Sequence, residues 1–144
     1  MALLGAFLIF REWPQFISDF KILQTPNGLV TMFLVLAFAK ICHEFGHALA
    51  CKYYGCKVPT MGLAMIVLWP LLWTETSDAW KLSKAHQRLI IDASGMIAEL
   101  ALAAIASILW VMLPAGQIKM MMHLLASTTW LMTLLVNLNP FMRF

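Results

Sequence analysis

Two histidines and a glutamate lie close together in the segment His43-Glu44-Phe45-Gly46-His47. In this H-E-x-x-H pattern on a helix, the histidines at i and i+4 project from one face and can bind the same metal ion. Zinc lowers the pKa of a bound water to about 7, and a glutamate on the adjacent face can then take its proton as general base. The motif therefore predicts a zinc site with His43 and His47 as ligands and Glu44 as the catalytic base for hydrolysis of a peptide bond.

The motif lies near one end of an apolar segment long enough to span a membrane. Ionisable groups are costly in a membrane helix and usually mark a functional site. The competing interpretation is a chance match, or a helix end that emerges into water, since Lys52 and Gly55 follow soon after. We favour the metal site because so specific a motif rarely occurs by chance in such a setting.

A catalytic zinc with two histidines needs a third protein ligand, which leaves one position for water. Cys51 shares their stripe, but eight residues of helix rise about 12 Å, so one ion cannot touch all three side chains. Glu99 is the deeper acid of the second apolar segment. Two interpretations of Glu99 stay open: a carboxylate that faces the metal site, or a hydrogen-bonded contact between helices.

The composition indicates a membrane protein. The 144 residues are 62% hydrophobic and 12% charged, with a mean hydropathy of +0.81, whereas a soluble domain is roughly half apolar and a quarter charged. These values exclude a disordered chain, a coiled coil and a typical soluble enzyme. The net charge of +3 is scattered and does not indicate a nucleic-acid partner. The three cysteines cannot make a complete disulfide framework.

The sequence predicts an all-α membrane protein with a core of three transmembrane helices over residues 28–144. Each span needs about 20 apolar residues, and the three segments that qualify are about 28–49, 89–113 and 124–141. Between the first two, Met61 to Trp73 is too short to span and is interrupted by Pro70. We expect a re-entrant segment or a short β-hairpin there.

Residues 1–27 form a separate N-terminal segment, which begins with the short apolar run Met1 to Phe10. This run is half a span, and we expect an interfacial anchor or part of a helix whose beginning is missing.

Basic residues predict the orientation. The loop between the first two spans carries an excess of lysine and arginine, while the next loop carries only Lys119. Because cytoplasmic loops hold this excess, the first loop and the nearby motif are expected on the cytoplasmic side. The basic residues of the first loop are Lys52, Lys57, Lys81, Lys84 and Arg88.

The third apolar segment ends in Asn137-Leu138-Asn139-Pro140-Phe141. Pro140 loosens the last helical turn, and an unwound polar segment at membrane depth is tolerated where it lines a cavity. Asn137 is therefore a candidate for hydrogen bonding to substrate or for orienting a ligand. An ordinary helix exit explains the same residues.

Together, the H-E-x-x-H motif and the segment from Asn137 to Phe141 resemble the site-2 protease family of intramembrane zinc metalloproteases, and a bacterial subgroup of peptide zinc metalloproteases in particular. The resemblance covers about residues 22–144. It implies a three-helix core with zinc near the cytoplasmic face, in the bacterial inner membrane. It also implies hydrolysis of peptide bonds in or beside a membrane segment of the substrate, with Asn137 at the family's amide position.

The chain departs from the family's pattern at two places. The family's third ligand is an aspartate eight positions after the asparagine, which would be position 145, after the last residue Phe144. The stretch Gly95 to Glu99 corresponds to the family's Gly-Pro-x-x-Asn region, but Glu99 and Met96 replace its asparagine and proline. We therefore expect an internal fragment of a longer protease, with weak zinc binding and the possibility of an inactive site.

The main hypothesis is a zinc-dependent intramembrane endopeptidase, with a membrane-embedded or membrane-proximal peptide and the lipid bilayer as partners. The alternatives are a catalytically incomplete membrane module of a peptide maturation or export system, and a small metal transporter that uses His43, Glu44 and His47 as a transit site.

Overall fold

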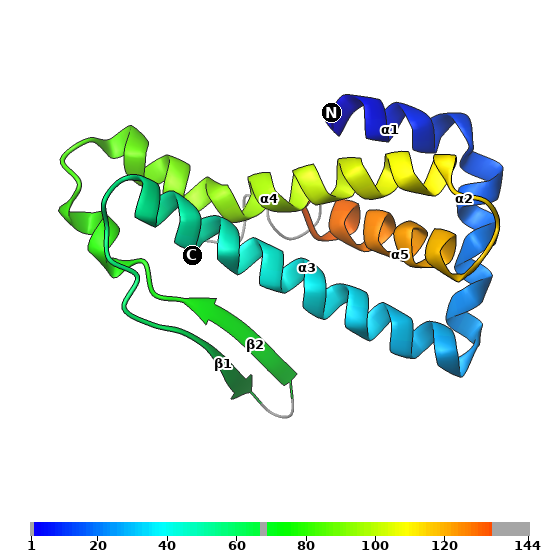
Figure 1. The fold of residues 1–144 in the computed structure, drawn as a ribbon, viewed down its shortest axis with the longest axis horizontal. Helices are drawn as coiled ribbons and strands as arrows, with labels where there is room; N and C mark the ends of the chain where they lie inside the picture. The colour runs from blue at the N-terminus through cyan, green and yellow to red at the C-terminus, as the bar shows by residue number, and fades with distance from the viewer. Residues whose placement is uncertain (1, 67–68, 134–144) are drawn as a thin grey trace. The chain divides into compact units, whose positions relative to one another are not determined.

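The computed structural model describes residues 2–66 and 69–133 (Figure 1). The chain is mainly helical with one β-hairpin, which confirms the helical class and the hairpin predicted between the first two apolar segments. The helices are α1 (Ala2–Arg11), α2 (Trp13–Asp19), α3 (Pro26–Tyr53), α4 (Ala85–Met112) and α5 (Gln117–Leu131), with short 3₁₀ turns η1 (Phe20–Gln24) and η2 (Ser77–Lys81). The hairpin consists of β1 (Met61–Ile66) and β2 (Trp69–Thr74).

Two helices, α3 and α4, are long and apolar enough to cross a membrane. Each has 28 residues, about 42 Å of helix. They cover the first two predicted spans almost completely. The third predicted span, about 124–141, begins inside α5 and continues beyond residue 133, where the description ends. Within the described ranges, then, two of the three predicted spans are candidates and the third is not shown.

Local sequence explains both ends of α3. At its start, the Thr25 hydroxyl accepts a hydrogen bond from the Gly28 N–H at 3.1 Å, and Pro26 occupies the first helical position, where no N–H is needed. At its end, Gly55 has a φ of +77°. The N–H groups of Cys56 and Gly55 donate to the carbonyls of Cys51 and Lys52, each at 3.0 Å. This is the Schellman pattern, which a glycine allows without strain.

The chain divides into two compact units, Lys40–Ala98 and the remaining residues on either side of it. The unit of residues 40–98 contains the H-E-x-x-H motif and the hairpin. Its apolar core consists of Cys51, Cys56, Ala79 and Ile91. This core joins the end of α3 to η2 and to the beginning of α4.

The other unit contains the N-terminal segment, which the sequence predicts as a partial helix or anchor. It forms α1, α2 and η1. Ile9 and Phe16 from these helices pack with Trp110 of α4. A second cluster joins α3, α4 and α5 through Val35, Ala39, Ala106, Leu124, Leu125 and Ala126.

The hairpin is an antiparallel pair in which Met61 is opposite Thr74 and Ile66 is opposite Trp69. It lies beside the C-terminal half of α3 (Figure 1), where the Thr74 hydroxyl donates to the Glu44 carbonyl at 3.3 Å. At the base of the hairpin, the Thr60 hydroxyl donates to the Glu75 carboxylate at 2.8 Å. The Thr74 contact connects the hairpin to the helix turn that carries the motif, and the Thr60 contact joins the two ends of the hairpin.

Candidate metal centre

The two motif histidines converge on one point. His43 and His47 lie on successive turns of α3, and their Nε2 atoms are 3.1 Å apart. The ring centroids are 4.8 Å apart, with the planes inclined at 72°. Both side chains are half-buried. This is the same-face placement that the i, i+4 spacing predicts.

The neighbouring helix α4 fixes the orientation of His47. The Nδ1 atom of His47 lies 2.8 Å from the Ile91 carbonyl oxygen. Because a carbonyl can only accept, Nδ1 carries the proton and Nε2 presents a lone pair. The Ser94 hydroxyl donates to the same carbonyl at 2.6 Å and lies 3.3 Å from Nδ1. A contact of this kind is typical of histidines that bind metals.

The 3.1 Å spacing is that of a hydrogen bond between the two rings, and it is also compatible with the spacing of two ligands on one zinc ion. Two nitrogens bound tetrahedrally at zinc–nitrogen distances of 2.0–2.1 Å lie about 3.3 Å apart, close to the 3.1 Å between these Nε2 atoms. Beside them lies Gly95 of α4, where an added Cβ would be 2.5 Å from both Nε2 atoms. Within residues 2–66 and 69–133, no group of three His, Cys, Asp or Glu side chains is placed to hold a metal.

Glu44 faces a small apolar cavity. The cavity has a volume of about 280 Å³. Its walls come from α3 and from the hairpin, and Glu44 is the one ionisable side chain among its lining residues. These are Ile41, Glu44, Phe45, Met61, Gly62, Leu72 and Trp73. Glu44 thus borders a space that suits an apolar group, and neither motif histidine is among the residues that line it.

Glu99, Asn137 and Cys51 are the other candidates from the sequence. Glu99 belongs to the other unit, where it is 1% exposed and accepts a hydrogen bond from the Thr133 hydroxyl at 3.1 Å. This bond joins α4 to the residues that follow α5. Asn137 lies outside the described residues, and its role stays a prediction. Cys51 is fully buried and packs with Cys56 rather than with the histidines.

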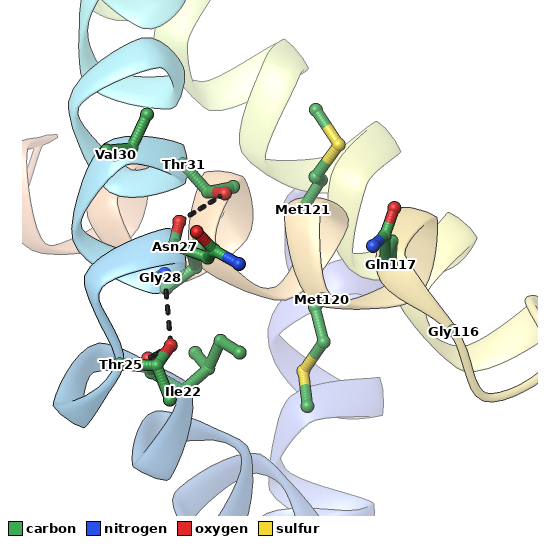
Figure 2. Close-up of a pocket in the computed structure, with 11 residues that line it drawn as sticks. Ile22, Thr25, Asn27, Gly28, Val30, Thr31, Gly116, Gln117, Met120 and Met121 are labelled. Carbon is green, nitrogen blue, oxygen red and sulfur yellow. Dashed lines mark hydrogen bonds between the residues drawn. The ribbon is translucent and has the colours of Figure 1, made fainter.

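A larger cavity, of about 710 Å³, lies in the unit that does not contain the motif (Figure 2). It is bordered by the beginnings of α3 and α5, with Thr25, Asn27 and Gln117 among its polar residues. None of its lining residues is a histidine, cysteine, aspartate or glutamate. It therefore has no group for acid–base or metal chemistry, and the motif remains the better candidate.

Ile91 and Ser94 of α4 were not predicted as parts of the site, and Gly95 entered only through the segment that resembles the family's middle-span motif. The sequence does contain one indication of this contact. The small residues Ala93, Ser94 and Gly95 allow two membrane helices to approach closely. The motif itself contains Gly46, whose added Cβ would be 2.7 Å from the Ser94 carbonyl oxygen. Two glycines at facing positions therefore mark where α3 and α4 come close together.

No family model, curated protein or solved structure matches this chain.

Proposed function

We propose that this chain is the core of a zinc-dependent endopeptidase that cleaves peptide segments in or beside a membrane. The observation that carries the proposal is the convergence of the His43 and His47 Nε2 atoms, 3.1 Å apart. The contact of His47 with the Ile91 carbonyl at 2.8 Å supports it, because it leaves Nε2 as an acceptor. Glu44 lies between the histidines in sequence and borders a cavity.

Each motif residue has a defined role in the proposed reaction. His43 and His47 would hold the zinc ion through their Nε2 atoms. A bound zinc supplies a Lewis acid that polarises a peptide carbonyl and acidifies water. Glu44 takes a proton from the attacking water and later gives it to the nitrogen of the leaving amine. One peptide bond and one water thereby become a carboxylic acid and an amine.

The surroundings of Glu44 suit an apolar peptide. The cavity beside it is lined mainly by apolar side chains of α3 and the hairpin. The hairpin is a two-stranded sheet, and an extended peptide can add to the edge of such a sheet through its backbone. A substrate with an apolar side chain near the cleaved bond would place that side chain in the cavity and its backbone along the edge of the hairpin.

The proposed location is a membrane, with the site near the cytoplasmic face. Two helices are long and apolar enough to cross a bilayer. The basic residues between them favour a cytoplasmic loop, and the motif lies towards that end of α3. The bacterial inner membrane is part of the proposal through the resemblance to site-2 proteases.

Replacement of Glu44 tests the proposal. The chain is reconstituted in liposomes with zinc and a fluorogenic peptide that has an apolar membrane segment. We expect Glu44→Gln to reduce cleavage by about 10²–10⁴-fold, the usual contribution of a general base, while zinc content stays unchanged. A chelator abolishes cleavage by the unaltered chain. Glu12→Gln, an acid-to-amide change at the residue just before α2, serves as the matched control and keeps full activity.

The other outcomes point to the alternative functions. Zinc entry into the liposomes without cleavage would indicate a metal transporter. Bound zinc with no cleavage and no flux would indicate a membrane module without catalysis.

A further inference from the structure

Gly95 of α4 lies against the paired histidines. It is buried, and a Cβ added there would lie 2.5 Å from the Nε2 atoms of both His43 and His47. It would also lie 2.7 Å from the His43 Cε1 atom. Carbon and nitrogen atoms that are not bonded prefer separations of about 3.5 Å or more. Any side chain at position 95 therefore competes with the two nitrogens for the same space.

We infer that Gly95 is a positioning residue of the metal site, because its missing side chain lets the two imidazoles converge against α4. The inference rests on the proposed function, since it assigns the convergence of the nitrogens to zinc binding. It adds a requirement that the motif alone does not contain: the helix that faces H-E-x-x-H must present a residue without a Cβ.

The alternative is that Gly95 only allows the helices to pack closely. The contrast with Gly46 argues against this. An alanine Cβ at Gly46 would meet the Ser94 carbonyl oxygen at 2.7 Å and its carbon at 3.1 Å. These are backbone atoms, which move only if the helices separate. At Gly95 the three nearest atoms belong to imidazole rings, and rings can turn away by rotation about their side-chain bonds.

Alanine substitutions at the two glycines are therefore expected to have different effects. Gly95→Ala turns the imidazoles apart and leaves the helix packing in place, so it weakens zinc binding more than it lowers the stability of the fold. Gly46→Ala separates the helices, so stability falls whether or not metal is present. Gly116→Ala is the neutral control, because nothing lies within 4 Å of its added Cβ and its φ of 164° is extended backbone.

The experiment uses the full chain in detergent and measures thermal unfolding with and without zinc, zinc affinity, and the visible absorption of the cobalt(II)-loaded chain. A metal that binds the folded state stabilises it by mass action. We expect metal-free Gly95→Ala to unfold only slightly below the unaltered chain, because turning His47 loses its bond to the Ile91 carbonyl, and well above Gly46→Ala. The zinc affinity of Gly95→Ala falls by about 10–100-fold, the range seen when groups that support a metal ligand are altered, and its cobalt absorption changes.

Each outcome decides between the claims. Equal zinc affinity in the unaltered chain and in His43→Ala would refute the proposed function, because the motif would then not bind the metal. Zinc affinity that depends on His43 but is unchanged in Gly95→Ala would refute the role of Gly95 and leave the proposed function intact. A metal-free Gly95→Ala chain that unfolds as easily as Gly46→Ala would also refute it, because the glycine would then serve helix packing.

Discussion

His47 uses one ring nitrogen to contact the Ile91 carbonyl, 2.8 Å away, and this contact determines what the other nitrogen can do. With Nδ1 protonated, Nε2 is an acceptor and can bind a cation. A histidine that merely ended a helix in water would have no reason to be held in one tautomer. The contact therefore favours a binding role for His47 over a solvated helix end.

His123, unlike His47, has its ring surrounded by aromatic side chains. It is fully buried in α5, and its ring lies 4.6 Å from that of Phe16 and 4.8 Å from that of Phe20. Among residues 2–66 and 69–133, neither of its ring nitrogens has a hydrogen-bond partner. A buried polar group without a partner costs about 1–3 kcal/mol. The surrounding aromatic rings suggest that an apolar ring fits this position better.

We therefore predict that His123→Phe stabilises the chain by about 1 kcal/mol, because it keeps the shape and removes two polar atoms. Denaturant unfolding in detergent measures the change. His86→Phe, at an exposed position, is the matched control and brings no gain. A loss of stability in His123→Phe would mean that the imidazole has a polar partner.

At the residue scale, the sequence predicted that His43 and His47 share one face of a helix, but not the residues of α4 that contact them. The i, i+4 spacing alone places His43 and His47 on one face. Gly95 and Ser94 could not be found this way, because the residue of α4 that faces the motif depends on how the helices pack. Glu99 illustrates the same limit: its bond to Thr133 matches one of the two interpretations that the sequence left open.

The connection from α3 to the hairpin depends on Asp78 of η2. The Lys57 backbone N–H donates to the Asp78 carboxylate at 2.8 Å, and Lys81 forms an ion pair with it. The hydrogen bond from Lys57, and then that from Lys81, lower the pKa of Asp78 below its usual value. The carboxylate thus links two segments that are 21 residues apart in sequence.

This link predicts a pH dependence of stability. Because the pKa of Asp78 is lowered in the folded chain, its stabilisation is fully present above the unfolded value of about 3.9 and is lost as the pH falls through the folded pKa. Asp78→Asn should therefore unfold at a lower temperature than the unaltered chain at pH 7. The two unfolding temperatures should approach each other below about pH 4. A difference that stays constant down to pH 2 would contradict this role.

The elements were predicted better than their contacts. Thr25, Pro26 and Gly55 are local signals, and they place the ends of α3 close to where the sequence suggested. The hairpin was predicted because the segment Met61 to Trp73 is too short to span a bilayer. Its attachment to the motif through Thr74 and the Glu44 carbonyl was not predictable, since it joins residues far apart in sequence.

For the whole molecule, the distribution of basic residues predicts a topology. We expect the segment between α3 and α4 to face the cytoplasm and the segment between α4 and α5 to face the opposite side. Lys84 and Ala115 are exposed positions in these two segments. Cysteine labelling in intact cells can distinguish the two sides.

In a background without the native cysteines, Lys84→Cys should react with a membrane-impermeant maleimide only after the cells are broken. Ala115→Cys should react in intact cells. Labelling of both positions in intact cells, with a cytosolic control protein unlabelled, would contradict a spanning α4. The reverse pattern would place the motif on the opposite side of the membrane.

The length of α3 also bears on how the proposed reaction obtains its second reactant. His47 lies 21 residues after Pro26 in one continuous helix, a distance of about 32 Å, and the hydrocarbon layer is about 30 Å thick. If α3 enters the bilayer at Pro26, the histidines reach the level of the lipid headgroups, where the solvent is already present. Water can reach the histidines at that level without a channel through the lipid. The peptide bond to be cleaved must therefore move to the headgroup level.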